Sequence, residues 1–293
     1  MMEADQRPVD RVIARAGDLP AMPAHVAEVM EVTDDPAVEM SEISDSIERD
    51  PALAAKILQV SNSPYYGLKQ YVGTLKLALV VLGVHEVRNI VLGISVFQML
   101  RNPNVDALLS HSFWRHSVLV GAFAKKLGTR LAVGLQGEDF MGGLLHDIGK
   151  MVLVRQLGAP YEKLFRASGG SSEPLCAMEM DALGFDHADA AAALGVRWNL
   201  PGALVDALCY HHAREDRSLG SAGQPALAAL VRIANLAVHD GFSDETGQTC
   251  RSCTEEEAWA LLGSPRAPTE VSSRCETLKG IAEELEGLGE PLF

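Results

Sequence analysis

The chain has 293 residues, of which 47% are hydrophobic and 22% are charged, and its formal net charge is −14. This composition is typical of a globular protein and excludes a disordered chain. We do not expect direct nucleic-acid binding, because phosphate contacts need clustered lysines and arginines. Half of the net charge lies in residues 241–293, which hold 11 acidic and 4 basic side chains. We expect this segment to be a solvated appendage.

The chain start carries no apolar run behind a basic segment, so a secretory signal is not expected. The most apolar region, 75–100, is interrupted by His85, Glu86 and Arg88. It falls short of the roughly 18 uninterrupted apolar residues of a membrane span. We therefore expect a soluble cytoplasmic protein without membrane contact.

The five cysteines are an odd number, and the Cys250-x-x-Cys253 pair lacks the second pair of a zinc site.

Apolar residues recur with helical spacing along most of the chain, and no stretch alternates as a sheet strand does. Asp50-Pro51 predicts a helix start, and Asn62-Ser63-Pro64 predicts its end. The predicted helices cover residues 23–32, 40–47, 51–61, 75–82, 87–100, 113–127, 138–154, 187–197, 201–211 and 225–238. The fold class is therefore all-α.

A polar stretch with Pro103 separates two predicted lobes. The predicted domains are a leader helix at 1–18, an N-terminal helical lobe at 19–110, a second helical lobe at 111–241 and an acidic helical appendage at 242–293.

The sharpest motif is His146-Asp147-Ile148-Gly149-Lys150, which follows an apolar helical segment. Imidazole and carboxylate groups are both ligands for divalent metals. Lys150 lies three residues after Asp147, where its ammonium could hold an anionic substrate near the metal. Further histidines lie beside apolar positions of other predicted helices, which fits a site where several helices converge. They are His116, His187, His211 and His212. We expect His25, His85, His111 and His239 to be ordinary core or surface groups.

Short motifs recur along both predicted lobes. The N-terminal lobe carries Leu19-Pro20, Asp50-Pro51, Asn62-Ser63, Tyr66-Gly67 and Leu82-Gly83. The second lobe carries Phe113-Trp114, His116, the run from Leu144 to Lys150, His187, Trp198, Leu200-Pro201 and Tyr210-His211-His212. Over about residues 12–240, these motifs resemble the HDOD domain, a branch of the HD phosphohydrolase superfamily. The resemblance implies a multi-helix HDOD fold in which the N-terminal lobe packs on a degenerate HD-type lobe.

The resemblance also implies which residues would bind metal. His116, His146 and Asp147 match the metal ligands of HD enzymes, and His187, His211 and His212 match three further histidines of the related HD-GYP phosphodiesterases. Two carboxylates of those enzymes are replaced here, by Ser112 and Asn235. The Gly-Tyr-Pro element after the double histidine is also absent. A neutral amide is a poorer metal ligand than a carboxylate.

Three interpretations remain open. The first is a regulatory signalling module that binds a partner protein or a small nucleotide-like ligand and is not catalytic. The second is a phosphohydrolase dependent on a divalent metal such as iron or manganese. It would act on a nucleotide or cyclic dinucleotide, with Lys150 as a catalytic group. In the third, the predicted histidine and aspartate site has a purely structural role and only fixes the packing of the helices.

Overall fold

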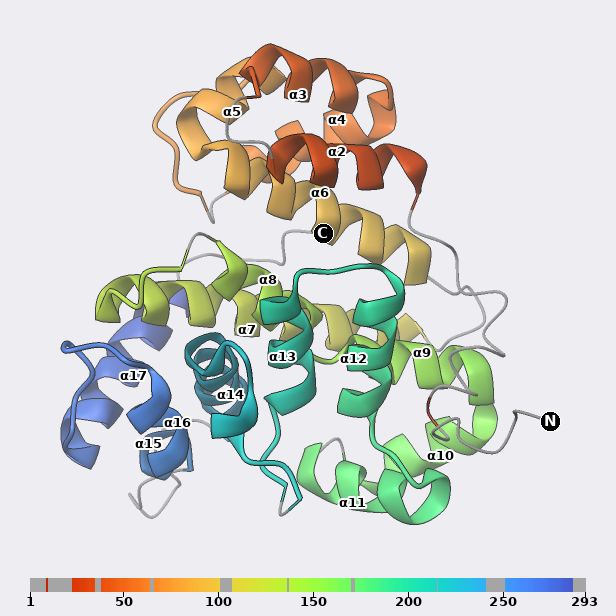
Figure 1. Cartoon of the computed structure of the whole chain (residues 1–293), viewed down its shortest axis with the longest axis vertical. Helices are drawn as coiled ribbons and strands as arrows, with labels where there is room; N and C mark the ends of the chain where they lie inside the picture. Colours follow the sequence, from red (N-terminus) through yellow and green to blue (C-terminus); the bar gives the residue numbers. More distant parts are fainter. Residues whose placement is uncertain are drawn as a thin grey trace. The chain divides into compact units, whose positions relative to one another are not determined.

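The structure is a computed structural model that describes residue 9 and residues 23–34, 38–63, 66–100, 107–135, 137–169, 172–214, 216–240 and 251–286. It is 76% helical, and the described residues form no β-strand. The all-α prediction is therefore confirmed. The chain folds into two compact units, which Figure 1 shows in sequence colours. Among the described residues, those within Pro20–Arg101 form the small unit, and those within Asn102–Leu285 form the large unit. The leader helix expected at 1–18 lies outside the described residues, apart from Val9.

The described part of the small unit is a cluster of helices around an aliphatic core. The helices are α2 (Ala24–Asp34), α3 (Met40–Glu48), α4 (Pro51–Ser61), α5 (Leu75–Leu82) and α6 (Val84–Leu100). Helix α4 begins as predicted, because the carboxylate of Asp50 accepts hydrogen bonds from the amides of Ala52 and Leu53 at 3.0 and 3.1 Å. Helix α5 ends as predicted at Gly83, whose φ of +88° suits glycine.

The Asn62 side chain, in the turn after α4, holds the segment that leads to α5. Its amide nitrogen donates to the carbonyls of Leu58 and Val72 at 2.7 and 2.8 Å. Its side-chain oxygen accepts from the amide of Val72 at 2.8 Å. Both N–H groups and the oxygen of this one side chain thus serve to fix a turn.

The large unit has α7 (Ala107–Leu131) as its longest described helix. Its other helices are α8 (Glu138–Leu145), α9 (Ile148–Leu157), α10 (Ala159–Ala167), α11 (Ser172–Leu183), α12 (His187–Arg197), α13 (Gly202–Tyr210), the 3₁₀ turn η1 (Leu219–Ser221), α14 (Pro225–Asp240), α15 (Arg251–Thr254), α16 (Glu256–Leu261) and α17 (Val271–Glu286). Helices α7 and α8 pack together, and α14 packs on α7 and on α13 (Figure 1).

The expectation that the acidic C-terminal segment is a solvated appendage is wrong for residues 251–286. Helices α15 and α16 pack on α14, and Trp259 and Ile281 are buried. The apolar residues between the acidic ones supply this contact, which the net charge does not reveal. Cys250 of the cysteine pair lies outside the described residues, and Cys253 is buried.

Among the described residues, no helix alone has both the length and the apolar character needed to cross a membrane. Helices α5 and α6 meet these criteria only when they are counted together, and they are bent by 117° at the break between them.

Candidate metal centre

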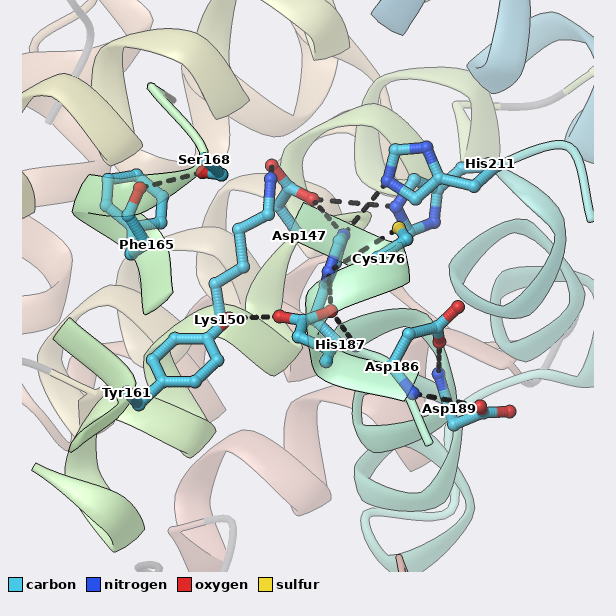
Figure 2. A network of polar contacts seen from close by, with 12 residues as sticks. Asp147, Lys150, Tyr161, Phe165, Ser168, Cys176, Asp186, His187, Asp189 and His211 are labelled. Atoms are coloured by element: carbon cyan, nitrogen blue, oxygen red, sulfur yellow. Dashed lines mark hydrogen bonds and ion pairs between the residues drawn. The ribbon is translucent and has the colours of Figure 1, made fainter. Parts of the chain in front are cut away.

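Four parts of the large unit bring the predicted site residues together. Helix α7 carries His116, and the turn between α8 and α9 carries His146 and Asp147. His187 is the first residue of α12, and His211 with His212 directly follows α13. Figure 2 shows the side chains of Asp147, His187 and His211 converging.

The single helix expected over 138–154 is interrupted at the motif itself. Helix α8 ends at Leu145, and Asp147 is the N-terminal cap residue of α9, with φ −94° and ψ 6°. These angles lie in the sparsely populated bridge region, where many active-site residues are found. The turn aims the Asp147 carboxylate toward the histidines, whereas in a continuous helix His146 and Asp147 would point to different sides.

Close helix contacts at glycines set the positions of these side chains. A Cβ on Gly143 of α8 would lie 2.6 Å from Cα of Gly121 on α7. A Cβ on Gly149 would lie 1.9 Å from the carbonyl oxygen of His187. Only glycine allows α9 and the start of α12 to approach this closely, so Gly149 brings His187 to Asp147.

The Asp147 carboxylate is the centre of the cluster. Its Oδ1 lies 3.3 Å from Nε2 of His187 and 3.5 Å from Nε2 of His211. Its Oδ2 lies 3.3 Å from Nε2 of His146, 3.8 Å from Nε2 of His116 and 2.6 Å from Nζ of Lys150. The predicted proximity of Lys150 and Asp147 is therefore present.

The Nδ1 atoms of three histidines lie beside acceptors, which orients their Nε2 atoms toward Asp147. Nδ1 of His146 lies 2.7 Å from the carbonyl of Gly143, and Nδ1 of His211 lies 2.8 Å from the carbonyl of Leu208. Nδ1 of His187 lies 2.7 Å from a carboxylate oxygen of Glu179. A proton on Nδ1 leaves the Nε2 lone pair of a neutral imidazole available for a metal, and this is the usual arrangement around metal-binding histidines.

The possible ligand atoms form two groups that share Asp147. One group comprises Asp147, His187, His211 and His212, and the other comprises His116, His146 and Asp147. Within the described part of the chain, three of these buried atoms have no hydrogen-bond partner: Nε2 of His146, Nε2 of His211 and Oδ1 of Asp147. Buried polar atoms are normally satisfied. Nitrogen lone pairs that face a carboxylate fit a divalent cation, so this donor set is suited to one.

Burial and neighbouring charges shift the pKa values of the cluster residues in different directions. Desolvation lowers the pKa of His211 to about 3, and it lowers the pKa of His212 well below its ordinary value. Burial alone would lower the pKa of His187, but the Glu179 carboxylate raises it well above 6.5. Burial would raise the pKa of Asp147, yet its interactions with His146 and Lys150 hold it well below 3.8. The carboxylate is therefore ionised.

The position that carries an aspartate in HD enzymes is occupied by Asn235 on α14. Its side-chain oxygen lies 3.1 Å from Nε2 of His116. His116 therefore has a neutral amide neighbour where a carboxylate would contribute charge. Desolvation and the nearby His146 lower the pKa of His116 to about 3. His239, expected to be an ordinary group, is exposed, although its ring centroid lies 6.4 Å from that of His116.

Sequence reasoning missed the residues that support His187. Glu179 on α11 accepts from both Nδ1 and the backbone amide of His187, at 2.7 and 2.9 Å. Tyr161 on α10 donates to the other Glu179 oxygen at 2.5 Å. The only available signal was a tyrosine and a glutamate in the stretch before His187, and neither residue type indicates its partner.

The HDOD domain model matches residues 19–214, about two thirds of the chain. An uncharacterized protein of Treponema pallidum (strain Nichols) is 25% identical over 201 residues. The match covers 68% of this chain and 38% of that relative, so this chain spans about two fifths of the relative's length.

Two solved structures share the fold. An HDOD domain protein with unknown function from Geobacter sulfurreducens has a TM-score of 0.73 at 22% identity, covering 96% of this chain and 97% of that chain. A protein provisionally named a signal transduction protein, from Marinobacter aquaeolei VT8, has a TM-score of 0.72 at 20% identity, covering 97% of this chain and 60% of that chain. The family match and the shared helical architecture confirm the resemblance seen in the motifs, and the chain belongs to the HDOD domain family.

Proposed function

We propose that this chain is a signalling module that holds a divalent metal ion at the Asp147 cluster and acts by binding a partner, without hydrolysing a substrate. The observation that carries this proposal is the burial of the donor set. The side chains of His146, His187 and His211 are 0% exposed, and that of Asp147 is 2% exposed. A catalytic metal keeps an open position for water or substrate, whereas a structural metal is enclosed by protein ligands.

The loss of carboxylates also favours binding over turnover. Asn235 is neutral, and Ser112 replaces the other carboxylate of the HD-GYP pattern. A site with fewer negatively charged ligands binds fewer divalent ions, or binds them more weakly. Phosphodiester hydrolysis relies on metals that activate water and neutralise developing charge.

In this proposal the ion is held by Asp147, His187, His211 and His212, with His116 and His146 as a second group. A bound cation would neutralise the carboxylate and tie the α8–α9 turn to α12 and to the end of α13. The stability of the large unit would then depend on metal, because binding free energy adds to folding free energy. The partner is a signalling protein or a small nucleotide-like ligand, and the name of the Marinobacter protein agrees with a role in signalling.

The second candidate function is a metal-dependent phosphohydrolase. One observation favours it: the His116 side chain is 22% exposed, so the cluster has a partly accessible side. In that case the ammonium of Lys150 would act on the phosphate of a nucleotide or cyclic dinucleotide.

The test is an assay of purified protein loaded with Mn²⁺ or Fe²⁺ on a panel of nucleotides and cyclic dinucleotides. We expect bound metal without turnover. Turnover that disappears in both His146→Ala and Asp147→Asn would instead establish the phosphohydrolase. If the protein takes up no metal and Asp147→Asn only reduces its stability, the cluster is a structural device and the proposal fails.

A further inference from the structure

A deeply buried arginine of the large unit links the histidine pair to the acidic C-terminal segment. Arg232 of α14 is 1% exposed. Its guanidinium donates to the carbonyl of Tyr210 from Nε at 3.1 Å and from Nη2 at 2.9 Å. Nη2 also donates to the carbonyl of His212 at 2.9 Å. These carbonyls flank His211, so the guanidinium fixes the backbone on both sides of that residue.

The third nitrogen of this guanidinium faces two acidic residues at the start of α16. Nη1 of Arg232 lies 3.2 Å from Oε1 of Glu255 and 3.4 Å from Oε2 of Glu257. A buried guanidinium needs such partners, because an unpaired buried charge is strongly destabilising. The two carboxylates lie beyond residue 214, where the match to the family model ends.

Glu257 is itself held in place by the turn that precedes α14. Its Oε1 accepts from the hydroxyl of Ser218 at 2.9 Å and from the amides of Leu219 and Gly220 at 2.8 and 3.3 Å. One carboxylate therefore ties η1, α14 and α16 together, and its other oxygen orients the guanidinium.

We propose that Arg232 is a positioning residue for His211 and His212, and that Glu255 and Glu257 of the C-terminal segment hold it in place. Glu255 and Glu257 are then part of the metal site's support, although neither belongs to the ligand groups. A test of this inference by metal affinity rests on the proposed metal function, whereas a test by the ring signals of the two histidines in metal-free protein does not. Removing a partner that orients metal ligands typically weakens metal affinity about 10–100-fold.

The chain offers a matched control within the same turn of α16. Glu256 pairs with Arg274 of α17, whose Nη1 and Nη2 lie 2.6 and 3.1 Å from its two carboxylate oxygens. Arg274 also donates to the carbonyl of Cys253 at 3.2 Å. Glu256→Gln therefore removes a charge and an ion pair from the same segment, without touching the Arg232 network.

The experiment compares wild type, the Glu255→Gln/Glu257→Gln double variant and Glu256→Gln in the full chain. The first readout is Co²⁺ affinity by titration, and the second is the imidazole NMR spectrum of His211 and His212 in metal-free protein. We expect the double variant to bind Co²⁺ at least about tenfold more weakly than wild type, with shifted ring signals of both histidines. Glu256→Gln should retain wild-type affinity and spectra. Arg232→Lys, which keeps the charge but loses the planar fork, should reproduce the double variant.

If the double variant has the Co²⁺ affinity and the ring signals of wild type, the inference is overturned. It is also overturned if Glu256→Gln binds Co²⁺ as weakly as the double variant and shows the same shifted ring signals, because the changes would then reflect a general loosening of the segment. If wild type binds no Co²⁺, the proposed metal function fails by itself. The ring signals then decide the positioning role alone: shifts confined to the double variant support it, and unchanged spectra refute it.

Discussion

Nζ of Lys150 lies 2.6 Å from Oδ2 of Asp147, the same carboxylate oxygen that faces His116 and His146. Both partners are buried, with side-chain exposures of 8% and 2%. The ammonium neutralises a carboxylate that would otherwise be costly to bury. It also places a positive charge where a divalent cation would bind, so in the proposed metal-bound state lysine and metal would compete for one oxygen.

Replacing Lys150 by methionine should therefore strengthen metal binding while it weakens the metal-free protein. We expect Mn²⁺ affinity to rise by at least about tenfold, because two cations brought close together repel each other strongly when they are desolvated. Calorimetric titration measures the affinity, and Lys163→Met on the exposed surface of α10 is the control. Unchanged affinity in Lys150→Met would show that the two cations do not share the site.

Restoring a carboxylate at Asn235 should recover a ligand beside His116. The side-chain oxygen already lies 3.1 Å from Nε2 of His116, so Asn235→Asp needs no rearrangement. We expect about tenfold tighter Mn²⁺ binding, since ligand charge sets affinity for hard cations. Metal analysis of dialysed protein provides the measurement. Asn199→Asp, at an exposed position, should behave as wild type. If Asn235→Asp binds Mn²⁺ no more tightly than wild type, the ion does not bind beside His116.

Gly149→Ala should destabilise the large unit by about 1–3 kcal/mol or more, the usual cost of overpacking. The added Cβ would lie 1.9 Å from the His187 carbonyl oxygen, so α12 would have to move. Gly202→Ala is the control, because nothing lies within 4 Å of its added Cβ. Urea unfolding compares the two variants. Equal stabilities would mean that α9 and α12 are farther apart than the structure has them.

Tyr161→Phe should cost about 1.5–3 kcal/mol at neutral pH, because the hydroxyl donates to the buried carboxylate of Glu179. Burial and the Glu179 charge raise the pKa of Tyr161 well above 10. The folded state therefore keeps this proton more firmly than the unfolded state does. The stabilisation is fully present below the unfolded pKa of about 10 and is lost as pH rises toward the folded value.

Stability curves of wild type and Tyr161→Phe should thus converge above pH 10. Tyr71→Phe serves as the reference, since Tyr71 is 78% exposed. Its stability should follow that of wild type at every pH. A constant difference between wild type and Tyr161→Phe up to pH 11 would contradict the assigned hydrogen bond.

The sequence predicts the features that local chemistry determines. The start of α4 followed from Asp50-Pro51, the end of α5 followed from Gly83, and α12 has the predicted bounds 187–197. The convergence of the histidines was visible only as one histidine beside each apolar segment, together with the family resemblance. Their relation to Asp147 depends on contacts between helices, which periodicity does not encode.

Other features depended wholly on tertiary contacts. The break at Asp147 arises in a stretch whose apolar spacing is continuous, so the pattern predicted one helix. The Glu179–His187 contact joins α11 to the start of α12. The ion pairs of Glu255 and Glu257 were not visible in the acidic run, because their partner, Arg232, is more than twenty residues away in sequence. Charge composition cannot identify a partner across such a distance.

The most direct test of the central claim is the metal stoichiometry of the full chain after loading with Mn²⁺ and dialysis, measured by elemental analysis beside Asp147→Asn. The variant removes the shared carboxylate charge from both ligand groups while keeping the side chain's size. We predict at least one tightly bound ion per wild-type chain and loss of that ion in a folded Asp147→Asn protein. Wild type that emerges folded and free of metal, or a variant that retains the same stoichiometry, would contradict the account.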